Sequence, residues 1–448
     1  MPLTQELGRL AATLSFEQLP PEAVEVVRTG FIDCVATMIA GAHDPAPQLL
    51  EKALAPPRGP ASLYFSGRAA PAPEAAWING TAGHALDYDD VGVRGHPSTV
   101  LVPTILAEAE ALDLSGAEMI AAYVAGYETW AELSRRDPGH HHRKGWHPTG
   151  IFGAIAAGAA CARLRRLDAD RATSAIALSA SQAGGIMANF GTMTKPFHAG
   201  SAAHAGLVSA RLAELGFTAA ADALEHPQGF LSAVSPDGRP DRTGPCPRFG
   251  EEWHILQHRL SIKKYPACYC THRALDAMLE LLARHPLKPA EIGRITVSLS
   301  QTHSLILRNH LPQTGLEAKF SMEFAMAAAV IARRASLAEY GDAFVKESAV
   351  QELMRRVHLV PNEDYDPEMI GASRFDRVSV DLADGRHLES EPVRRARGHA
   401  ERPLGEAELF EKFRSCLDAG GAPIAPEALF ERLRRLERIS ARELTAVS

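Results

Sequence analysis

Residues 79–103, NGTAGHALDYDDVGVRGHPSTVLVP, decide the fold and hold the candidate site of this chain. Gly92 and Gly95 interrupt any helix between the acidic first half and the apolar run, so the stretch predicts helix, loop, helix. We expect Ser98 or Thr99 to cap the second helix. The apolar positions expected to face inward on that helix are Val100, Leu101, Ile105 and Leu106.

The middle of this stretch concentrates titratable side chains within thirteen positions. They are His84, Asp87, Asp89, Asp90, Arg94 and His96. The start of a helix offers free N–H groups and the positive end of a dipole, which suit a bound carboxylate. Imidazoles and carboxylates beside such a helix start indicate a chemical site. The alternative is a solvated acidic loop with ordinary histidines.

Composition places the chain among ordinary globular proteins and excludes some partners. The 448 residues are enough for two or three domains, and 46% of them are hydrophobic and 23% charged. The net charge of -7 argues against nucleic acid as a partner, because phosphate binding needs a clustered basic face. No long uncharged apolar run and no signal-peptide pattern are visible, so we expect no membrane partner and a cytoplasmic location.

The periodicity of apolar residues predicts a mainly α protein with a smaller α+β part. Helices are expected at residues 4–13, 21–41, 98–112, 116–133, 149–164, 169–183, 271–283, 319–334, 346–357, 406–419 and 426–439, with a further helix ending near residue 215. Strict alternation predicts strands at 292–299 and 377–382, and a return strand at 386–389. We therefore expect a helical domain over 1–264 and 397–448, formed by both ends of the chain, with an α+β domain inserted over 265–396.

The same arrangement occurs twice, because His96 and His147 each stand directly before a proline at a predicted helix start. This repetition favours a functional role for both histidines. Lys195 also precedes a proline, so we expect it in an extended or turn conformation, where it could hold a carboxylate beside a helix dipole. The alternative for Lys195 is a solvated surface charge.

Two clusters carry weak metal signals, and we assign no metal to either. Consecutive histidines at 140–142 point in different directions in a loop and lack the helical spacing of a chelating pair. Cys268 and Cys270 with His272 lack a second ligand pair, so packing is the favoured interpretation. No nucleotide-binding glycine loop or cysteine set for an iron–sulfur cluster stands out, and we infer no cofactor.

Seven segments in order resemble the MmgE/PrpD family, which includes 2-methylcitrate dehydratase, cis-aconitate decarboxylase and iminodisuccinate epimerase. The matching segments are NGTAGHALDYDD, GHPST, GWHPTG, TKPFHAGSAAHAG, KKYPAC followed by His272, GLEAKFSMEF and GHAERPLGEAELFEKF. The resemblance spans nearly the whole chain. It implies a large all-helical domain made from both chain ends, a smaller α+β lid, a pocket between them and a homodimer.

The resemblance also implies which residues form the pocket. The positions that correspond to pocket residues of decarboxylase-type relatives are Asp87, His96, His147, Lys195 and Lys263, with Lys264 as the alternative to Lys263. We take Asp87, His96 and His147 as catalytic candidates. Lys195, Lys263, His198 and His204 are the candidates for substrate binding.

The expected activity is that of a cofactor-independent lyase of dehydratase type, similar to 2-methylcitrate dehydratase, which removes a proton α to a carboxylate. Its expected substrate is a small di- or tricarboxylate held by lysines and imidazoles. Phe324 and Val91 stand where the decarboxylase has a tyrosine and a threonine, which weighs against decarboxylation itself. An epimerase with the same acid–base set, a decarboxylase and a non-catalytic carboxylate-binding protein remain alternatives.

Overall fold

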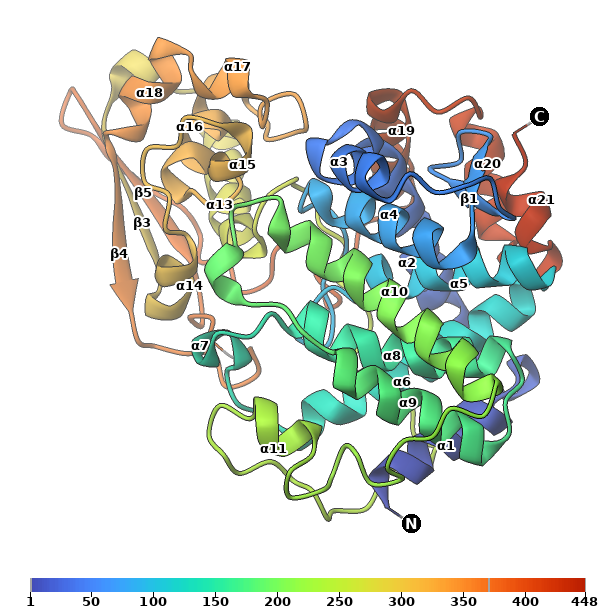
Figure 1. Ribbon diagram of the computed structural model, residues 1–448. Coiled ribbons are helices and arrows are strands. Elements are labelled where there is room, and N and C mark those ends of the chain that lie inside the picture. The colour runs from blue at the N-terminus through green and yellow to red at the C-terminus, as the bar shows by residue number, and fades with distance from the viewer. Residues whose placement is uncertain (1, 370, 448) are drawn as a thin grey trace. The chain divides into compact units, whose positions relative to one another are not determined.

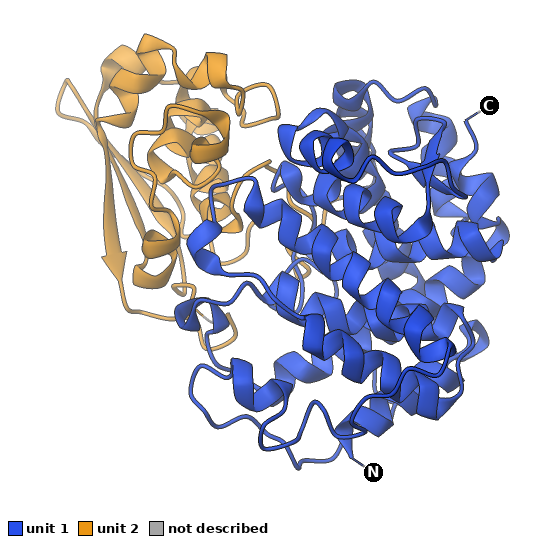
Figure 2. Ribbon diagram, viewed as in Figure 1, with its two compact units in different colours: residues 1–261, 405–448 blue, residues 262–404 orange. Residues whose placement is uncertain are grey.

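The computed structural model describes residues 2–369 and 371–447. Helices hold 56% of the residues and strands only 9%, which confirms the expected mainly α class. The chain forms two compact units, unit 1 with residues 1–261 and 405–448 and unit 2 with residues 262–404 (Figure 2). The domain limits expected from the sequence, 1–264, 265–396 and 397–448, stay a prediction, because the compact units are defined by contacts and not by whether each segment folds on its own.

Unit 1 is built almost entirely of helices (Figure 1). Its α-helices are α1 (Leu3–Thr13), α2 (Pro21–Ala40), α3 (Pro45–Leu54), α4 (Ala72–Ala85), α5 (Ser98–Leu112), α6 (Gly116–Arg136), α7 (His141–Lys144), α8 (Pro148–Leu164), α9 (Ala169–Gln182), α10 (Thr194–Glu214), α11 (Phe230–Val234), α12 (His254–His258), α19 (Glu406–Gly420), α20 (Pro426–Arg434) and α21 (Ala441–Thr445). A two-stranded hairpin, β1 (Ala61–Leu63) with β2 (Arg68–Ala70), was not expected from the sequence.

The core of unit 1 depends on small residues that let helices approach closely. Helix α10 packs against both α4 and α8. A Cβ atom added to Gly200 would lie 2.2 Å from the carbonyl oxygen of Trp77 on α4, and one added to Gly206 would lie 2.4 Å from the Cβ of Ala157 on α8. These separations are shorter than any normal contact, so glycine is required at both positions.

The C-terminal segment of the chain packs within unit 1. Helix α19 packs against α2, and α20 packs against α19 and α2. Phe413 of α19 and Phe430 of α20 are both buried, with their ring centroids 5.4 Å apart. Residues from the two ends of the chain therefore share one core.

Unit 2 contains a four-stranded sheet with strand order β4-β3-β5-β6 and short helices. The strands are β3 (Ile292–Ser300), β4 (Val357–Asn362), β5 (Arg377–Leu382) and β6 (His387–Glu389), and the helices are α13 (His272–Arg284), α14 (Gln301–Ile306), α15 (Gly315–Ala318), α16 (Met322–Ala332), α17 (Asp342–Val345) and α18 (Ser348–Met354). The expected strands are confirmed. Strand β4, which pairs in parallel with β3, was not foreseen, and the helix expected over 346–357 ends at Met354.

No helix among the described residues is long and apolar enough to cross a membrane.

Candidate functional site

The candidate site of unit 1 lies where the loop after α4 meets the starts of three helices. His96 lies in this loop just before α5, His147 is the N-cap of α8, and Lys195 lies in the first turn of α10. The two His-Pro steps therefore stand at helix starts, as predicted. The prediction of an extended or turn conformation for Lys195 is wrong, because α10 already begins at Thr194. A proline in the first turn removes only an N–H that would lack a helical partner.

The loop itself has an unusual backbone. Asp87, Val93 and Arg94 have φ angles of 50°, 41° and 67°, in the left-handed region that residues other than glycine rarely adopt. Gly92 and Gly95 close the loop tip through two backbone hydrogen bonds of 3.0 and 2.8 Å. Strained conformations persist only where surrounding contacts impose them, and they cluster at functional sites.

Ser98 does not cap α5 as expected, and neither does Thr99. Pro97 is the N-cap residue, and no side chain caps the helix. The Ser98 hydroxyl instead donates to the Asp90 carboxylate and lies 2.7 Å from the Tyr123 hydroxyl. Burial raises the pKa of Asp90 well above its usual range. A buried carboxyl group needs hydrogen-bond partners, and the Ser98 hydroxyl is one of them. The expectation that Val100, Leu101, Ile105 and Leu106 face inward is confirmed, since all four are buried.

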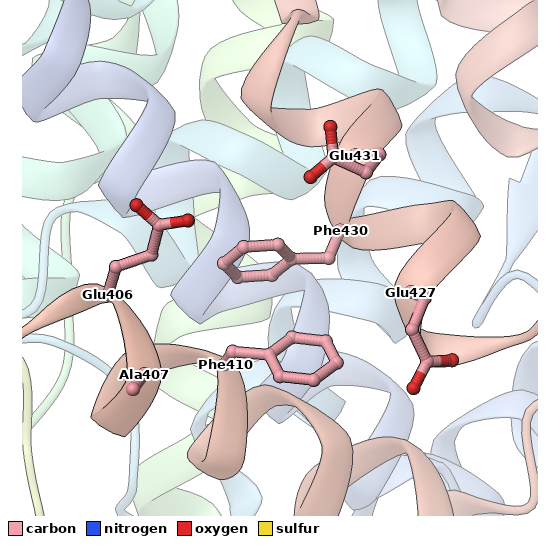
Figure 3. A pocket seen from close by; sticks show the side chains of 6 residues that line it. All are labelled: Glu406, Ala407, Phe410, Glu427, Phe430 and Glu431. Carbon is pink, nitrogen blue, oxygen red and sulfur yellow. The ribbon is translucent and has the colours of Figure 1, made fainter.

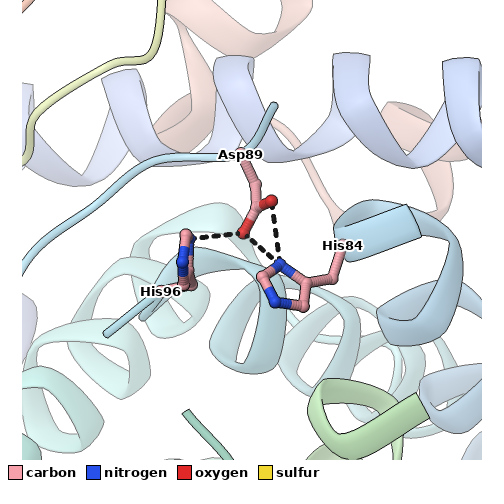
Figure 4. Close-up of side chains that lie close together, drawn as sticks. All are labelled: His84, Asp89 and His96. Carbon is pink, nitrogen blue, oxygen red and sulfur yellow. Dashed lines mark hydrogen bonds and ion pairs between the residues drawn. The ribbon is translucent and has the colours of Figure 1, made fainter. Parts of the chain in front are cut away.

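His84 and Asp89, both buried, and the half-buried His96 form a hydrogen-bonded group (Figure 4). Nδ1 of His84 lies 2.9 Å from both carboxylate oxygens of Asp89, and Nδ1 of His96 lies 3.1 Å from one of them. Burial alone would raise the pKa of Asp89, but the two imidazoles hold it well below its usual range. Asp89 is therefore an ionised acceptor shared by two rings.

These contacts fix the tautomers of both imidazoles. Nδ1 of His96 also lies 2.8 Å from the Asp90 carbonyl oxygen, so each of its neighbours is an acceptor and Nδ1 must carry the proton. The same holds for Nδ1 of His84, which faces only the Asp89 carboxylate. Each neutral ring then has its lone pair on Nε2. The Nε2 atom of His84 is buried and has no hydrogen-bond partner among the described residues.

The same three residues are the one group among residues 2–369 and 371–447 whose ligand atoms lie close enough to hold a metal ion, within 4.8 Å of one another. The Nδ1 atoms of His84 and His96 donate to Asp89, and that of His96 donates also to a carbonyl oxygen, so they could bind an ion only after losing their protons. The geometry therefore fits a carboxylate that orients two imidazoles better than a metal centre.

His147 joins this group from the start of α8. Its ring centroid lies 5.8 Å from that of His84, in a stacked arrangement, and 4.8 Å from the Phe190 ring. Its Nδ1 lies 3.1 Å from Nδ1 of His198 on α10. Burial, followed by the charge of Lys195, lowers the pKa of His147 well below its usual range and that of His198 to about 4. Both rings are therefore neutral near pH 7.

Lys195 and Asp87 form a buried ion pair at the same site. The Lys195 Nζ lies 2.6 Å from a carboxylate oxygen of Asp87, and both side chains are about 6% exposed. The ammonium group also lies 5.4 Å from the centre of the Phe190 ring. The interpretation of Lys195 as a solvated surface charge is therefore wrong.

The remaining expected site residues are His204 of unit 1 and Lys263, with Lys264 as its alternative, of unit 2. His204, further along α10, packs against Trp77 with ring centroids 4.6 Å apart. Lys263 is buried in unit 2, whereas Lys264 is exposed beside the Tyr265 ring. The structure thus brings Asp87, His96, His147, Lys195 and His198 together within unit 1, and it describes Lys263 as part of unit 2.

The weak metal clusters of the sequence are dispersed or chemically unsuited. His141 bonds to Asp137, while the neighbouring His142 contacts the Phe190 ring. A hydrogen bond with Cys268 and burial raise the pKa of Cys270 well above its usual range. Nε2 of His272 lies 3.3 Å from a backbone carbonyl oxygen.

A shallow groove between α19 and α20 is a second place where side chains gather (Figure 3). The described residues that line it are Glu406, Ala407, Phe410, Glu427, Phe430 and Glu431. The side chains that line this groove include two aromatic rings and three carboxylates but no cationic group, so they would not attract a substrate that carries carboxylates. The histidine group is therefore the better candidate for chemistry.

Two members of the site, His84 and Asp89, belong to the titratable cluster that the sequence indicated but were not chosen as catalytic or substrate-binding candidates. Both stood in the acidic stretch, but their spacing of five residues fits no motif. Their role becomes visible only because the loop turns back and places the Asp89 carboxylate between two rings. Phe190, which contacts both His147 and Lys195, carried no signal in the sequence.

Several known proteins of similar sequence are described as cis-aconitate decarboxylases or as like them. The human cis-aconitate decarboxylase is 28% identical over 357 residues, which cover 76% of this chain and 72% of that protein. The cis-aconitate decarboxylase of Aspergillus terreus is 25% identical over 92% of this chain and 89% of its own length. A cis-aconitate decarboxylase-like protein of Aspergillus oryzae is 27% identical over 97% of this chain and 93% of its own length.

The two domains of one family account for most of the chain. The MmgE/PrpD N-terminal domain matches residues 5–243, and the MmgE/PrpD C-terminal domain matches residues 265–433. The segments that carried the resemblance lie within these ranges, except that KKYPAC begins at Lys263, two residues before the second range; the first match contains the whole histidine group. The chain is therefore a member of the MmgE/PrpD family.

Proposed function

We propose that this protein is a lyase that acts on a small di- or tricarboxylate, and that its reaction is a dehydration begun by removal of a proton α to a carboxylate. Similarity to proteins named cis-aconitate decarboxylase supports the class of enzyme and the carboxylate substrate. The observation that carries the chemistry is the fixed tautomer of His96, whose Nδ1–H is held by Asp89 and by the Asp90 carbonyl.

His96 is the proposed base. With Nδ1 protonated, its Nε2 lone pair is the proton acceptor, and the Asp89 carboxylate stabilises the imidazolium that forms. The C–H electron pair becomes the new C=C bond as the C–O bond of the leaving hydroxyl breaks. Asp89 thereby supplies the negative charge that the base needs once it has taken up the proton.

His147 is the proposed partner that donates a hydrogen bond from its neutral ring to the leaving hydroxyl, which departs as water with the proton that His96 has taken up. It faces His198 through Nδ1, so a proton on one of these nitrogens fixes the tautomer of the other ring. The His147 and His96 rings both lie near His84, with the ring centroid of His147 5.8 Å and that of His96 4.5 Å from its own. In this proposal one imidazole removes the proton and the other holds the leaving hydroxyl.

Lys195 is the proposed carboxylate-binding group. It is buried, so its charge is little screened, and it lies in the first turn of α10, where the helix dipole also favours an anion. Asp87 holds the ammonium group in place in the absence of substrate. In this proposal a substrate carboxylate becomes a second partner of Lys195. Lys263 is the proposed second cation.

Decarboxylation is the second candidate, and the names of the relatives favour it. It requires a proton to be delivered to carbon as carbon dioxide leaves, and therefore a protonated acid at the start. The pKa values of His84, His147 and His198 are all lowered, which favours neutral bases near pH 7 and hence removal of a proton. An epimerase would use the same first step and return the proton to the opposite face.

Incubation in heavy water with methylcitrate, citrate, cis-aconitate and iminodisuccinate tests these reactions against one another. A dehydratase forms an unsaturated acid and one water, seen as a rise in ultraviolet absorbance. Release of carbon dioxide from cis-aconitate would replace this proposal by decarboxylation. Deuterium at the α carbon with loss of optical rotation and no alkene would replace it by epimerisation.

Matched variants tie the activity to the histidine group. His96→Gln should abolish turnover, whereas His387→Gln, an exposed histidine of unit 2 bonded to Asp381, should leave it unchanged. Full turnover by His96→Gln would exclude His96 as the base. If the unaltered protein bound some of these acids but turned over none of them, the result would favour a non-catalytic binding protein.

A further inference from the structure

Lys412 connects the C-terminal segment of the chain to the loop of the candidate site. It lies on α19, and its Nζ donates to the Tyr88 carbonyl oxygen at 2.7 Å. The same atom lies 2.5 Å from a carboxylate oxygen of Asp33 on α2 and 4.0 Å from the centre of the Tyr88 ring. Lys412 is 6% exposed, so these contacts are shielded from solvent.

Tyr88 is the residue between the two acidic side chains that organise the site. Asp87 bonds to Lys195, and Asp89 bonds to His84 and His96. The carbonyl that Lys412 holds belongs to the peptide group that joins Tyr88 to Asp89. A shift of this peptide group would therefore move the Asp89 carboxylate relative to both imidazoles.

The loop needs such an anchor because its backbone is strained. Asp87, directly before Tyr88, has a φ angle of 50°, and a residue other than glycine holds this conformation only where neighbouring contacts impose it. A charged donor gives a stronger hydrogen bond to a carbonyl than a neutral donor does. Lys412 supplies that donor from a helix more than three hundred positions away in sequence.

We propose that Lys412 is a positioning residue of the site, which holds the Tyr88 carbonyl so that Asp89 fixes the orientation and tautomer of His84 and His96. The inference rests on the proposed function only for the consequence in turnover. The geometry of the loop can be tested without any substrate.

The alternative is that Lys412 only neutralises the buried Asp33. Lys412→Met would leave Asp33 without this cation and could unfold the protein, which would not separate the two roles. The deciding variant is therefore Asp33→Asn/Lys412→Met, which removes both charges of the pair at nearly constant volume. Phe413→Leu, the next residue of α19, disturbs packing against α20 without touching the loop and serves as the control.

The readout is the side-chain nitrogen spectrum of the full-length protein labelled with ¹⁵N-histidine, together with thermal melting. The Nδ1–H signals of His84 and His96 are assigned with His84→Gln and His96→Gln. We expect Asp33→Asn/Lys412→Met to melt cooperatively but to shift both signals or lose them to exchange with water. Phe413→Leu should lower the melting temperature and leave both signals in place.

Unchanged Nδ1–H signals of His84 and His96 in the folded double variant would overturn the proposal and leave Lys412 a structural ion-pair partner. With an acid that the enzyme turns over, kcat of the double variant should fall roughly tenfold or more, because small misplacements of catalytic groups are costly. If no acid is turned over, the proposed function fails, while the spectra still decide the role of Lys412.

Discussion

Nδ1 of His147, at the start of α8, lies 3.1 Å from Nδ1 of His198 on α10. Only one of two facing nitrogen atoms can donate, so each ring fixes the tautomer of the other. Protonation of both rings would bring two N–H groups and two charges together. Burial is the main cause of the lowered pKa of His147, and Lys195 and His198 add to it. As long as both rings are neutral, one proton therefore lies between the two Nδ1 atoms, and the ring that accepts it carries its own proton on Nε2.

The buried His84 predicts how stability depends on pH. Burial lowers its pKa to about 3 in the folded protein, against about 6.5 in an unfolded chain. Between these values only the unfolded chain binds the proton, so falling pH removes about 1 kcal/mol of unfolding free energy per pH unit. Glu128, whose pKa burial raises to about 7, titrates with the opposite sign, so the comparison must be between variants.

We therefore expect the unfolding free energy of the unaltered protein, minus that of His84→Gln, to decrease as pH falls from 6.5 to 4.5. Urea unfolding at several pH values measures this difference. A difference that stays constant over this range would mean that His84 is protonated as easily in the folded protein as in the unfolded chain.

Replacement of Lys195 should affect both activity and folding. Lys195 is buried and paired with Asp87, so Lys195→Met leaves a buried carboxylate without this cation. We expect a loss of about 3 kcal/mol in unfolding free energy. Loss of a charge-assisted contact to substrate should also lower kcat/KM by roughly 1.5–3 kcal/mol.

A double variant separates the two effects of Lys195. Asp87→Asn/Lys195→Met should recover most of the stability, measured by urea unfolding, because neither charge remains buried. It should stay deficient in kcat/KM, since the cation is still missing. Recovery of activity together with stability would show that Lys195 acts only through the fold.

Asp89→Asn should keep the volume of the side chain but lower the catalytic activity. An amide has one acceptor oxygen and a donor NH₂ group, so it cannot accept from both Nδ1–H groups as the carboxylate does. We expect kcat to fall about 100-fold, within the range that general acid–base catalysis contributes. Steady-state kinetics with circular dichroism on the same sample checks this, and unchanged kcat would show that Asp89 is not needed to orient His96.

Removal of metal ions should leave activity unchanged. The Nδ1 atoms of His84 and His96 carry protons that bond to Asp89, so they are not available as ligands. Dialysis against a chelator followed by an assay, with and without added zinc, measures this. Loss of activity on dialysis and its return with zinc would make His84, Asp89 and His96 a metal site.

The close packing of α10 on α4 predicts a large effect from one added methyl group. A Cβ atom at Gly200 would lie 2.2 Å from the Trp77 carbonyl, so Gly200→Ala forces the helices apart and should cost about 1–3 kcal/mol. Gly184→Ala is the control, because nothing lies within 4 Å of a Cβ atom there. Equal melting temperatures of the two variants would contradict this account of the packing.

Helices whose apolar periodicity is bounded by clear breaking residues could be predicted well. Helix α5 begins at Ser98 and ends at Leu112, as expected, because its apolar positions repeat at helical spacing and the loop before it contains two glycines. Strand β4 was missed because it contains Pro361 and its pairing partner β3 lies far away in sequence. Its conformation depends on the sheet rather than on local preference.

The site could be predicted in part. His96, His147 and Lys195 were recognisable because each stands beside a proline near a helix start. The contacts of Ser98 and the role proposed for Asp89 could not be foreseen, because both depend on which buried group lies opposite in the folded loop. The expected homodimer and cytoplasmic location remain predictions.

The interruption of unit 1 by unit 2 fixes an order of events on the ribosome. Residues 1–261 are synthesised first, unit 2 follows, and α19 leaves the ribosome only afterwards. Helix α2 therefore lacks its packing partner α19 while unit 2 is being synthesised. The Tyr88 carbonyl meets the Lys412 ammonium group only after this delay, so the loop acquires its final set of contacts late in translation.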